Sequence, residues 1–245
     1  MERLNTQAEE FSDFVSEALR KLNVCSGMTV ADIGCGTGYV SMMMSNLVGL
    51  NGKVVGLDAN FNALEYCKRL ADKNKKKNLE FVIGDAQQME FLPAIFDAVY
   101  SRFLLQHLKE PKKCLHEMIR ITKPNGLVMI EDCDLRLWMV EPQDKYIEEL
   151  WTWYEFIVRQ KGSDPTIGIK LYNMFVNEGL QPKVEVYSKP LFANDKMWNS
   201  ITLVLEKANA GLDNEAIVGI KNFMQRRDAI FIFPLVFRVW AQIRC

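Results

Sequence analysis

The sequence lacks the features that mark several special classes of protein. Its 245 residues include six widely spaced cysteines and no Cys-x-x-Cys pair, which argues against a disulfide scaffold and against the common zinc sites. Thirty Lys and Arg residues against 31 Asp and Glu residues give a formal net charge of −1, so no global positive field would attract nucleic acid. We therefore expect a reducing, cytoplasmic setting and no nucleic-acid partner.

Long hydrophobic runs are also missing. The most apolar segment, residues 229–243, is shorter than the roughly 20 residues that a membrane-spanning helix needs, and it contains Pro234 and Arg238. The N-terminal segment MERLNTQAEEFSDF is acidic and lacks the basic-then-apolar order of a signal peptide. We expect residues 229–243 to form a buried strand, and we expect neither export nor a membrane partner.

What the sequence does contain is an alternation of short apolar runs and helical patterns. This alternation is typical of a parallel sheet that helices cover on both faces. An amphipathic helical pattern precedes it in the first 25 residues. The expected strands are 29–33, 53–57, 79–83, 96–100 and 127–130, and the expected helices are 39–48, 61–73 and 111–122.

The alternation ends after Asp134. Long helical patterns follow, the first of them rich in aromatic residues, and two late strands are expected to form an antiparallel pair at one edge of the sheet. The expected later elements are helices at 141–162, 164–180, 196–208 and 214–226, and strands at 183–192 and 229–243.

A glycine-rich loop, Gly34, Gly36 and Gly38 within "TVADIGCGTGYV", follows the first expected strand. In an open α/β sheet ligands bind beyond the carboxyl ends of the strands, and glycine lets the backbone turn tightly or approach a ligand closely. Neither Gly34 nor Gly36 starts a complete G-x-G-x-x-G pattern, which disfavours a pyrophosphate site. A tight turn that binds no ligand is the alternative.

Carboxylates occur at the ends of the first three expected strands. Asp32 precedes the loop, Asp58 is placed to accept hydrogen bonds from a ribose diol, and Asp85 with the N–H of Ala86 is placed to bind adenine. Asp58 alone would suit NAD equally well. Three acids in this order favour a nucleoside that carries a positive charge over one that carries two phosphates.

Five segments in order resemble the motifs of the class I S-adenosylmethionine-dependent methyltransferases, closest to the branch of ubiquinone/menaquinone-type and natural-product enzymes. They are "VADIGCGTG", "VVGLDAN", "IGDAQQMEF", "FDAVYSRFLLQHL" and "ITKPNGLVMIED". The resemblance implies a doubly wound, Rossmann-like sheet of seven mostly parallel strands with the last strand antiparallel. It also implies that S-adenosylmethionine is the cofactor.

The resemblance assigns cofactor contacts to the glycine loop, to the three strand ends and to an N-terminal segment that closes over the methionine carboxylate in some relatives. For the two residues of the N-terminal segment, Arg3 and Gln7, a solvated helix face is an equally good alternative. The expected cofactor residues are Arg3, Gln7, Asp32, Gly34, Gly36, Gly38, Asp58, Ala59, Asp85, Ala86 and Arg102.

Methyl transfer requires an aligned acceptor and sometimes the removal of one proton, so no unique catalytic motif is expected. His107, after the fourth expected strand, is a candidate general base because histidine titrates near neutral pH, and a hydrogen bond to the backbone is the alternative. No metal is expected. The candidate acceptor contacts are Glu131 and Asp134 and the aromatic residues Trp138, Trp151 and Tyr154, although aromatic stripes of this kind often belong to a core.

The sequence therefore predicts an enzyme that transfers a methyl group directly to a small-molecule acceptor. A protein or RNA methyltransferase and a non-catalytic cofactor-binding module are the alternatives, and the N-P-P-Y motif of nucleic-acid amino methylases is replaced here by "SRFL". We expect one domain over residues 1–245, with an N-terminal helix (1–25) and a cofactor-binding core (26–134). Helical insertions at 135–165 and 193–227 are expected to cover the acceptor site.

Overall fold

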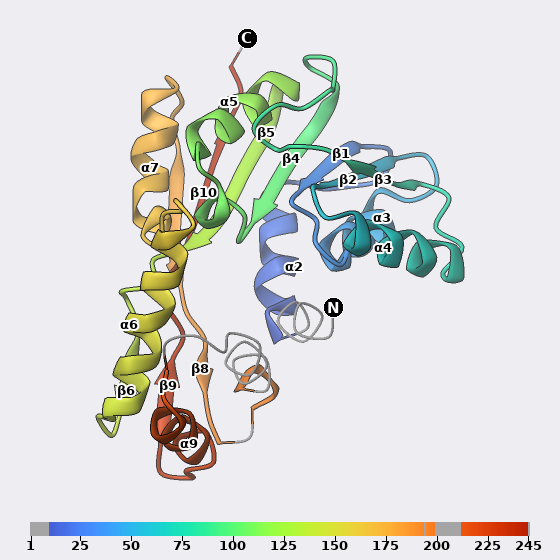
Figure 1. The fold of residues 1–245 in the computed structure, drawn as a ribbon. Helices are drawn as coiled ribbons and strands as arrows, with labels where there is room; N and C mark the ends of the chain where they lie inside the picture. The colour runs from blue at the N-terminus through green and yellow to red at the C-terminus, as the bar shows by residue number, and fades with distance from the viewer. Residues whose placement is uncertain (1–9, 194, 199–211, 245) are drawn as a thin grey trace.

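The computed structural model describes residues 10–193, 195–198 and 212–244, and its main feature is a seven-stranded sheet (Figure 1). The strand order is β3-β2-β1-β4-β5-β10-β7. The first five strands run parallel, and β10 lies antiparallel between β5 and β7, which confirms the expected sheet. The strands are β1 (Thr29–Ile33), β2 (Lys53–Asp58), β3 (Leu79–Ile83), β4 (Phe96–Arg102), β5 (Thr122–Cys133), β7 (Lys183–Tyr187) and β10 (Val236–Gln242).

Helices cover both faces of this sheet. One face carries α5 and α7 over a core that includes Val99, Ile130 and Val239, and the other carries α2 and α3 over Val30 and Met129. Local signals fix the helix ends: Asn60 caps α4 by accepting from the N–H of Ala63, and a proline opens α5. These helices are α2 (Ser12–Lys21), α3 (Tyr39–Val48), α4 (Phe61–Lys73), α5 (Pro111–Ile121) and α7 (Ile167–Asn177).

The predicted boundaries in the first half of the chain agree closely with the structure. Strands 29–33 and 79–83 and helices 39–48 and 61–73 have the expected bounds. The fourth strand, expected to end at residue 100, continues to Arg102, so it places that side chain on the sheet. The fifth starts at Thr122, directly after α5, because Lys123–Gly126 continue the strand around a register shift against Phe96 and Ala98.

A second layer, which the sequence did not predict as a sheet, follows the main one. It consists of α6 (Lys145–Gln160), α9 (Asn214–Phe223) and three short strands in the order β6-β9-β8. The strands are β6 (Met139–Glu141), β8 (Pro190–Leu191) and β9 (Ile230–Ile232). Figure 1 shows this layer beyond the carboxyl ends of β4 and β5.

Two expected strands are each broken in two, which corrects the sequence prediction. The apolar segment 229–243 forms β9 and β10, separated by residues that include Pro234, because proline has no N–H to donate to a ladder. The segment 183–192 likewise forms β7 and β8, so each half joins a different sheet. Most of the expected helix 196–208 lies outside the described residues.

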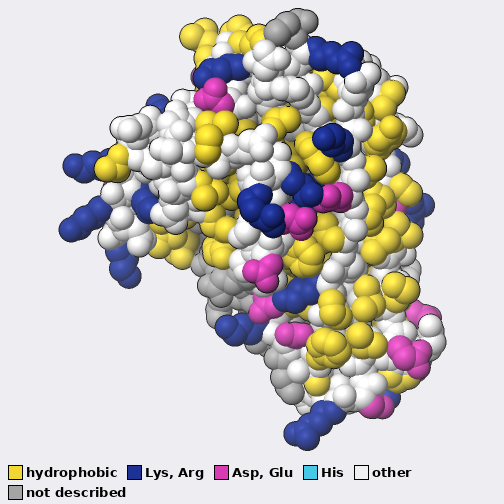
Figure 2. Space-filling model, turned by 180° about the vertical axis from the view of Figure 1, so that it is seen from behind, with side chains coloured by type: hydrophobic (Ala, Val, Ile, Leu, Met, Phe, Trp, Pro, Cys, Tyr) yellow, Lys and Arg dark blue, Asp and Glu magenta, His cyan; other side chains and the backbone are white. Residues whose placement is uncertain are grey.

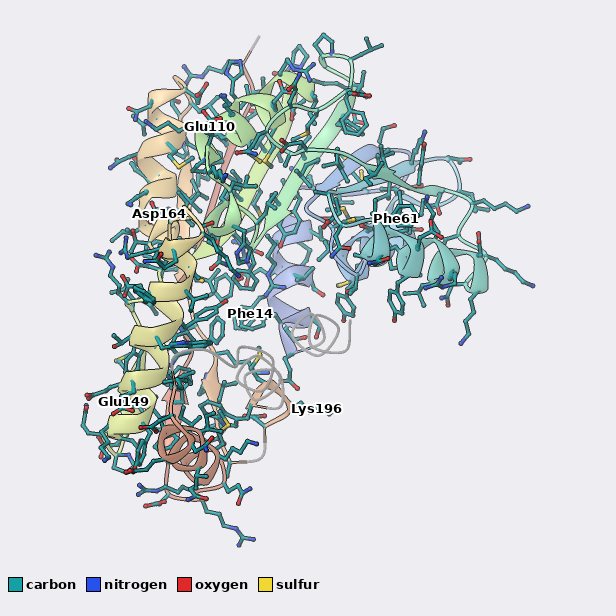
Figure 3. All side chains as sticks on the ribbon, in the orientation of Figure 1. Phe14, Phe61, Glu110, Glu149, Asp164 and Lys196 are labelled. Carbon is teal, nitrogen blue, oxygen red and sulfur yellow. The ribbon has the colours of Figure 1, made fainter. Side chains whose placement is uncertain are left out.

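The second layer has a core of its own, and α2 connects that core with the main one. Phe11, immediately before α2, is buried among residues of the second layer, whereas Val15 and Leu19 of the same helix are buried against the main sheet. Figure 3 shows Phe14 projecting from α2, and its ring stacks on that of Tyr187, the last residue of β7, with ring centres 4.3 Å apart. The helix therefore holds the two layers together.

The surface carries no extended region of one charge on the face shown in Figure 2, where basic, acidic and apolar side chains are interspersed. Within residues 10–193, 195–198 and 212–244, none of the helices combines the length and the apolar character that crossing a membrane would require.

Candidate functional site

The glycine loop lies directly against its neighbours. Gly34 and Gly38 have φ values of +74° and +75°, which only glycine adopts at low cost. A Cβ atom at Gly34 would lie 2.9 Å from the side chain of Leu104, and one at Gly38 would lie 2.9 Å from Phe81. The N–H of Gly34 also donates to the carbonyl of Leu57 on β2, at 2.7 Å. The loop is therefore a fixed backbone cradle at the carboxyl end of β1.

Asp58, the last residue of β2, faces this cradle. Its Oδ2 accepts from the N–H of Gly36 at 2.8 Å, and its Oδ1 accepts from the N–H of Asn60 at 2.8 Å. The side chain is half-buried, and each carboxylate oxygen keeps a second lone pair for a ligand hydroxyl. Ala59, beside it, is exposed. The backbone thus orients Asp58 as an acceptor at the edge of the cradle.

Asp85 lies at the next strand end, as predicted. Its carboxylate is exposed and accepts from the N–H of Gln87 at 2.8 Å, while Ala86 is buried. Asp58 is the direct strand partner of Ile83, whose side chain is 58% exposed. The structure therefore brings two carboxylates beside an exposed apolar side chain, which suits a sugar joined to a flat base. Sequence reasoning missed Ile83 because a strand-end isoleucine is normally read as core.

Asp32 has a different environment from the one predicted. It is 3% exposed, and its Oδ2 accepts from the hydroxyl of Ser41 on α3 at 2.6 Å. Burial raises the pKa of Asp32 to about 6. The carboxylate therefore joins β1 to α3 beneath the loop, which supports the cradle from below. This burial does not favour the direct contact between Asp32 and the cofactor that the sequence predicted.

Arg102 ends β4, next to the point where the glycine loop leaves β1. Its side chain is 7% exposed, and its guanidinium carbon lies 4.7 Å from the ring centre of Phe11 and 4.4 Å from that of Phe103. Its Nε and Nη2 are buried and have no hydrogen-bond partner among the described residues. Phe103 has φ +52°, an uncommon conformation for an aromatic residue. A buried cation with unused donors is suited to bind an anionic ligand group.

The two acids expected to contact the acceptor are instead bonded to the protein. Glu131 is fully buried, and its Oε1 accepts from Nε of Arg238 at 2.5 Å. Asp134 is also fully buried, and its Oδ2 accepts from Nη2 of Arg136 at 2.7 Å. Burial of a carboxylate requires such partners, so both side chains are bonded within the protein at the strand end. Because both side chains are fully buried, neither is open to an acceptor in this structure.

The expected aromatic contacts are similarly placed in a core. Trp151 on α6 is 6% exposed and stacks on Phe231 of β9 with ring centres 5.5 Å apart. Trp138 stacks on Trp151 at 6.2 Å, and Tyr154 meets Trp151 edge to face at 5.9 Å. Trp138 also lines a groove of about 510 Å³ with Met139 and other residues of β6 and β9. Packing within the second layer is the role that these contacts show.

Three predicted site residues remain: His107, Arg3 and Gln7. His107 lies exposed at the end of a short 3-10 helix, η1 (Leu105–His107), which follows β4. Its role as a general base stays a prediction. Arg3 and Gln7 lie outside the described residues.

Asp132 is a buried acid that sequence reasoning did not select. Its Oδ2 accepts from the N–H of Gln106 at 3.1 Å and its Oδ1 from the N–H of Cys133 at 3.0 Å, so it ties η1 to the end of β5. Burial raises the pKa of Asp132 to about 7. The available signal for Asp132 was the run of acids at the end of a buried strand. Sequence reasoning selected Glu131 and Asp134 from that run instead.

The Asp132→Asn variant should gain stability relative to wild type as the pH rises. The folded state holds the Asp132 proton more tightly than the unfolded state, so its contribution is complete below the ordinary pKa of 3.8 and is lost as the pH rises through about 7. Urea unfolding should show the variant gaining roughly 2–3 kcal/mol on wild type between pH 5 and pH 8. The exposed Asp13→Asn change is the control. A difference that does not depend on pH would show that Asp132 is ionised throughout.

Residues 25–179, more than half of the chain, match the profile of a family described as a methyltransferase domain. The chain belongs to this family. The predicted resemblance to the S-adenosylmethionine-dependent methyltransferases is confirmed. The family membership also gives S-adenosylmethionine as the cofactor of this methyltransferase.

Two curated relatives illustrate the extent of the likeness. A demethylmenaquinone methyltransferase from Oceanobacillus iheyensis is 35% identical over 113 residues, which are 46% of this chain and 48% of that protein. A ubiquinone/menaquinone biosynthesis C-methyltransferase from Pseudomonas savastanoi pv. phaseolicola is 33% identical over 140 residues, which are 57% of this chain and 52% of that protein. The methyltransferase thus spans about half the length of the curated relatives it matches.

Solved structures support the fold. A SAM-dependent methyltransferase from Aquifex aeolicus matches this methyltransferase with a TM-score of 0.57 and 20% identity, over 94% of this chain and 89% of that chain. The likeness extends well beyond residue 179, where the family match ends. At this level of identity it shows the shared fold, including the sheet that carries the glycine loop.

Proposed function

We propose that this methyltransferase transfers a methyl group from S-adenosylmethionine directly to a small-molecule acceptor. The observation that carries the proposal is the bond between Asp58 and the N–H of Gly36, which joins a ribose-type acceptor to the glycine cradle. The relatives named for quinone biosynthesis support a small acceptor with an apolar or aromatic body.

The residues present fit this cofactor along its whole length. Asp58 would accept from the ribose hydroxyls, Asp85 and the N–H of Ala86 would bind the adenine edge, and Ile83 would contact its face. The glycine cradle would receive the methionine portion. Arg102, with two buried donors unused among the described residues, would bind the carboxylate. The assignment therefore uses the open donors and acceptors that the site shows.

When bound, the cofactor supplies a methyl group on a positively charged sulfur, which is already a good leaving group. The protein's task is then to align the acceptor and to exclude water, which is worth more here than acid or base catalysis. We infer that α2 and the second layer, beyond the carboxyl ends of β4 and β5, form the cover of the acceptor site. His107 is the candidate base in this arrangement.

Labelled S-adenosylmethionine tests the proposed acceptor class. The protein is incubated with it and with separate metabolite, protein and RNA fractions, and transferred label is measured in each. Label should enter the metabolite fraction. Label in protein or RNA alone would replace the small-molecule proposal with one of the two alternatives, and binding of the cofactor with no transfer to any fraction would favour a non-catalytic module.

The Asp58→Ala variant should bind S-adenosylhomocysteine roughly 10-fold to 150-fold more weakly than wild type, because hydrogen bonds to a charged group contribute about 1.5–3 kcal/mol. Titration calorimetry measures both affinities. The control is Asp97→Ala, which removes a carboxylate that accepts from the N–H of Thr29 at 2.8 Å. Since Thr29 and Asp97 lie at the amino ends of β1 and β4, this control should keep the wild-type affinity. Equal binding by folded Asp58→Ala would show that the ribose assignment is wrong.

A further inference from the structure

A row of alternating charges crosses four neighbouring strands of the main sheet. Arg102 on β4 is the direct partner of Glu131 on β5, Glu131 of Arg238 on β10, and Arg238 of Glu185 on β7. We call these four residues the charge row. Direct partners in register lie on the same face of a sheet, so the four side chains share one face. The row runs from the end of the candidate site to the edge of the sheet.

Three members of the charge row are buried. Arg102, Glu131 and Arg238 have side chains that are 7%, 0% and 1% exposed, whereas Glu185 is 37% exposed. Nη1 of Arg238 donates to Glu185 at 3.0 Å. Burying charges is a costly way to stabilise a sheet, since well-packed apolar residues of similar size are often equally good. The charge row therefore calls for an explanation beyond the stability of the sheet.

The partners of Glu131 are unequal. Its Oε1 is held by Arg238 at 2.5 Å, and Arg238 is in turn fixed to α2 because its Nη2 donates to the carbonyl of Phe14 at 2.6 Å. Its Oε2 accepts from the hydroxyl of Tyr100 and lies 3.6 Å from Nε of Arg102. Glu131 is thus hydrogen-bonded to Arg238 and to Tyr100, whereas Arg102 lies near it without a hydrogen bond.

This geometry leaves Arg102 incompletely compensated. A separation of 3.6 Å between Nε of Arg102 and Oε2 of Glu131 gives attraction without a hydrogen bond. Arg238, by contrast, pairs closely with Glu131 and also with Glu185 and Glu17. The rings of Phe11 and Phe103 both lie against the guanidinium of Arg102, which restricts its movement. An anionic group on a ligand would use the open donors of Arg102.

We propose that Glu131 is a positioning residue, which holds Arg102 in place to bind the carboxylate of the cofactor's methionine portion. This inference rests on the proposed function and deepens it, because it names the residue through which the cofactor's carboxylate is selected. Glu131 acts through Arg102 and does not touch the cofactor. Arg238 acts one step further away, because it fixes Glu131 and the carbonyl of α2 at the same time.

Titration calorimetry with two ligands tests the proposal. S-adenosylhomocysteine carries the carboxylate, and its decarboxylated analogue lacks only that group. Glu131→Gln should weaken binding of S-adenosylhomocysteine roughly tenfold and change the affinity for the analogue less than about twofold. The matched control is Glu185→Gln, which removes the same charge at the other end of the charge row and should leave both affinities unchanged. Equal weakening of both ligands by Glu131→Gln would overturn the proposal.

A double-mutant cycle shows whether Glu131 acts through Arg102. Arg102→Gln should abolish the preference for the carboxylate-bearing ligand, and adding Glu131→Gln to it should cause no further loss. Additive losses would overturn the proposal. Because Glu131→Gln removes the carboxylate that is bonded to Nε of Arg238, the pair Glu131→Gln with Arg238→Gln provides a variant in which both members of that ion pair are neutral, and it should show the same selective loss. If wild type binds neither ligand, the proposed function itself fails.

Discussion

Replacing Trp151 with alanine should lower the free energy of unfolding by about 3–5 kcal/mol, the usual cost of removing a buried tryptophan. The side chain is 6% exposed and lies against Phe231 at 5.5 Å with an angle of only 2° between the rings. Trp138 and Tyr154 contact it as well, so its loss leaves a cavity that these rings cannot close without moving. Urea unfolding followed by circular dichroism measures the change.

Phe156→Ala on the same helix is the matched control. Its side chain is 55% exposed, so the same kind of truncation should change the free energy of unfolding by less than about 1 kcal/mol. If Trp151→Ala unfolds like wild type while turnover of the acceptor falls, Trp151 faces the acceptor and the role predicted from the sequence is right. A large loss of stability assigns it to the core of the second layer.

Arg238→Met should also destabilise the protein by about 3–5 kcal/mol, because it leaves the fully buried Glu131 without the arginine that holds it. Glu131→Gln added to Arg238→Met should recover much of that loss, since the carboxylate that Arg238→Met leaves without its arginine is then neutral. Thermal and urea unfolding of the two single variants and the double variant measure this coupling.

Arg226→Met provides a surface comparison for this prediction. Arg226 and Asp228 also form an ion pair, at 2.9 Å, but their side chains are 39% and 71% exposed. An exposed pair contributes about 0–1 kcal/mol, so this variant should be close to wild type. Losses that simply add in the Arg238 and Glu131 double variant would contradict the view that the two charges compensate each other.

The first half of the fold could be predicted because its signals are local. The strands at residues 29–33 and 79–83 are short apolar runs bounded by glycine or polar residues, and helix 61–73 starts at the capping residue Asn60. The position of Asp58 at a strand end followed from the same pattern. The pattern did not predict the hydrogen bond from the N–H of Gly36 to Asp58, because that bond depends on how closely the glycine loop approaches β2.

The second layer could not be predicted in the same way, because its strands are only two or three residues long and pair across large distances in the sequence. Met139 pairs with Ile232, and Pro190 pairs with the same residue from the other side. Strand periodicity needs more residues than these to be recognised. The aromatic pattern of α6 was visible, but whether Trp151 faced a pocket or a core depended on this unpredicted sheet.

The roles of the acids could not be predicted either, because they depend on residues far away in the sequence. Sequence reasoning selected Glu131 and Asp134 at the end of the fifth strand as acceptor contacts, but their partners within the protein could not be read from the pattern. Arg238, which bonds to Glu131, lies 107 residues away on a strand that is antiparallel to β5. Burial also separates Asp32 from Asp58, although both stand near strand ends. Long-range pairing therefore decides which acids remain available to a ligand.

Titration calorimetry of the wild-type chain with S-adenosylhomocysteine and with NADH tests the central claim most directly. The glycine cradle, Asp58 and Asp85 are proposed to bind a nucleoside joined to an amino acid, in a loop that does not complete the dinucleotide pattern. S-adenosylhomocysteine should bind with one site per chain and NADH should show no comparable binding. Tighter binding of NADH than of S-adenosylhomocysteine would contradict the account.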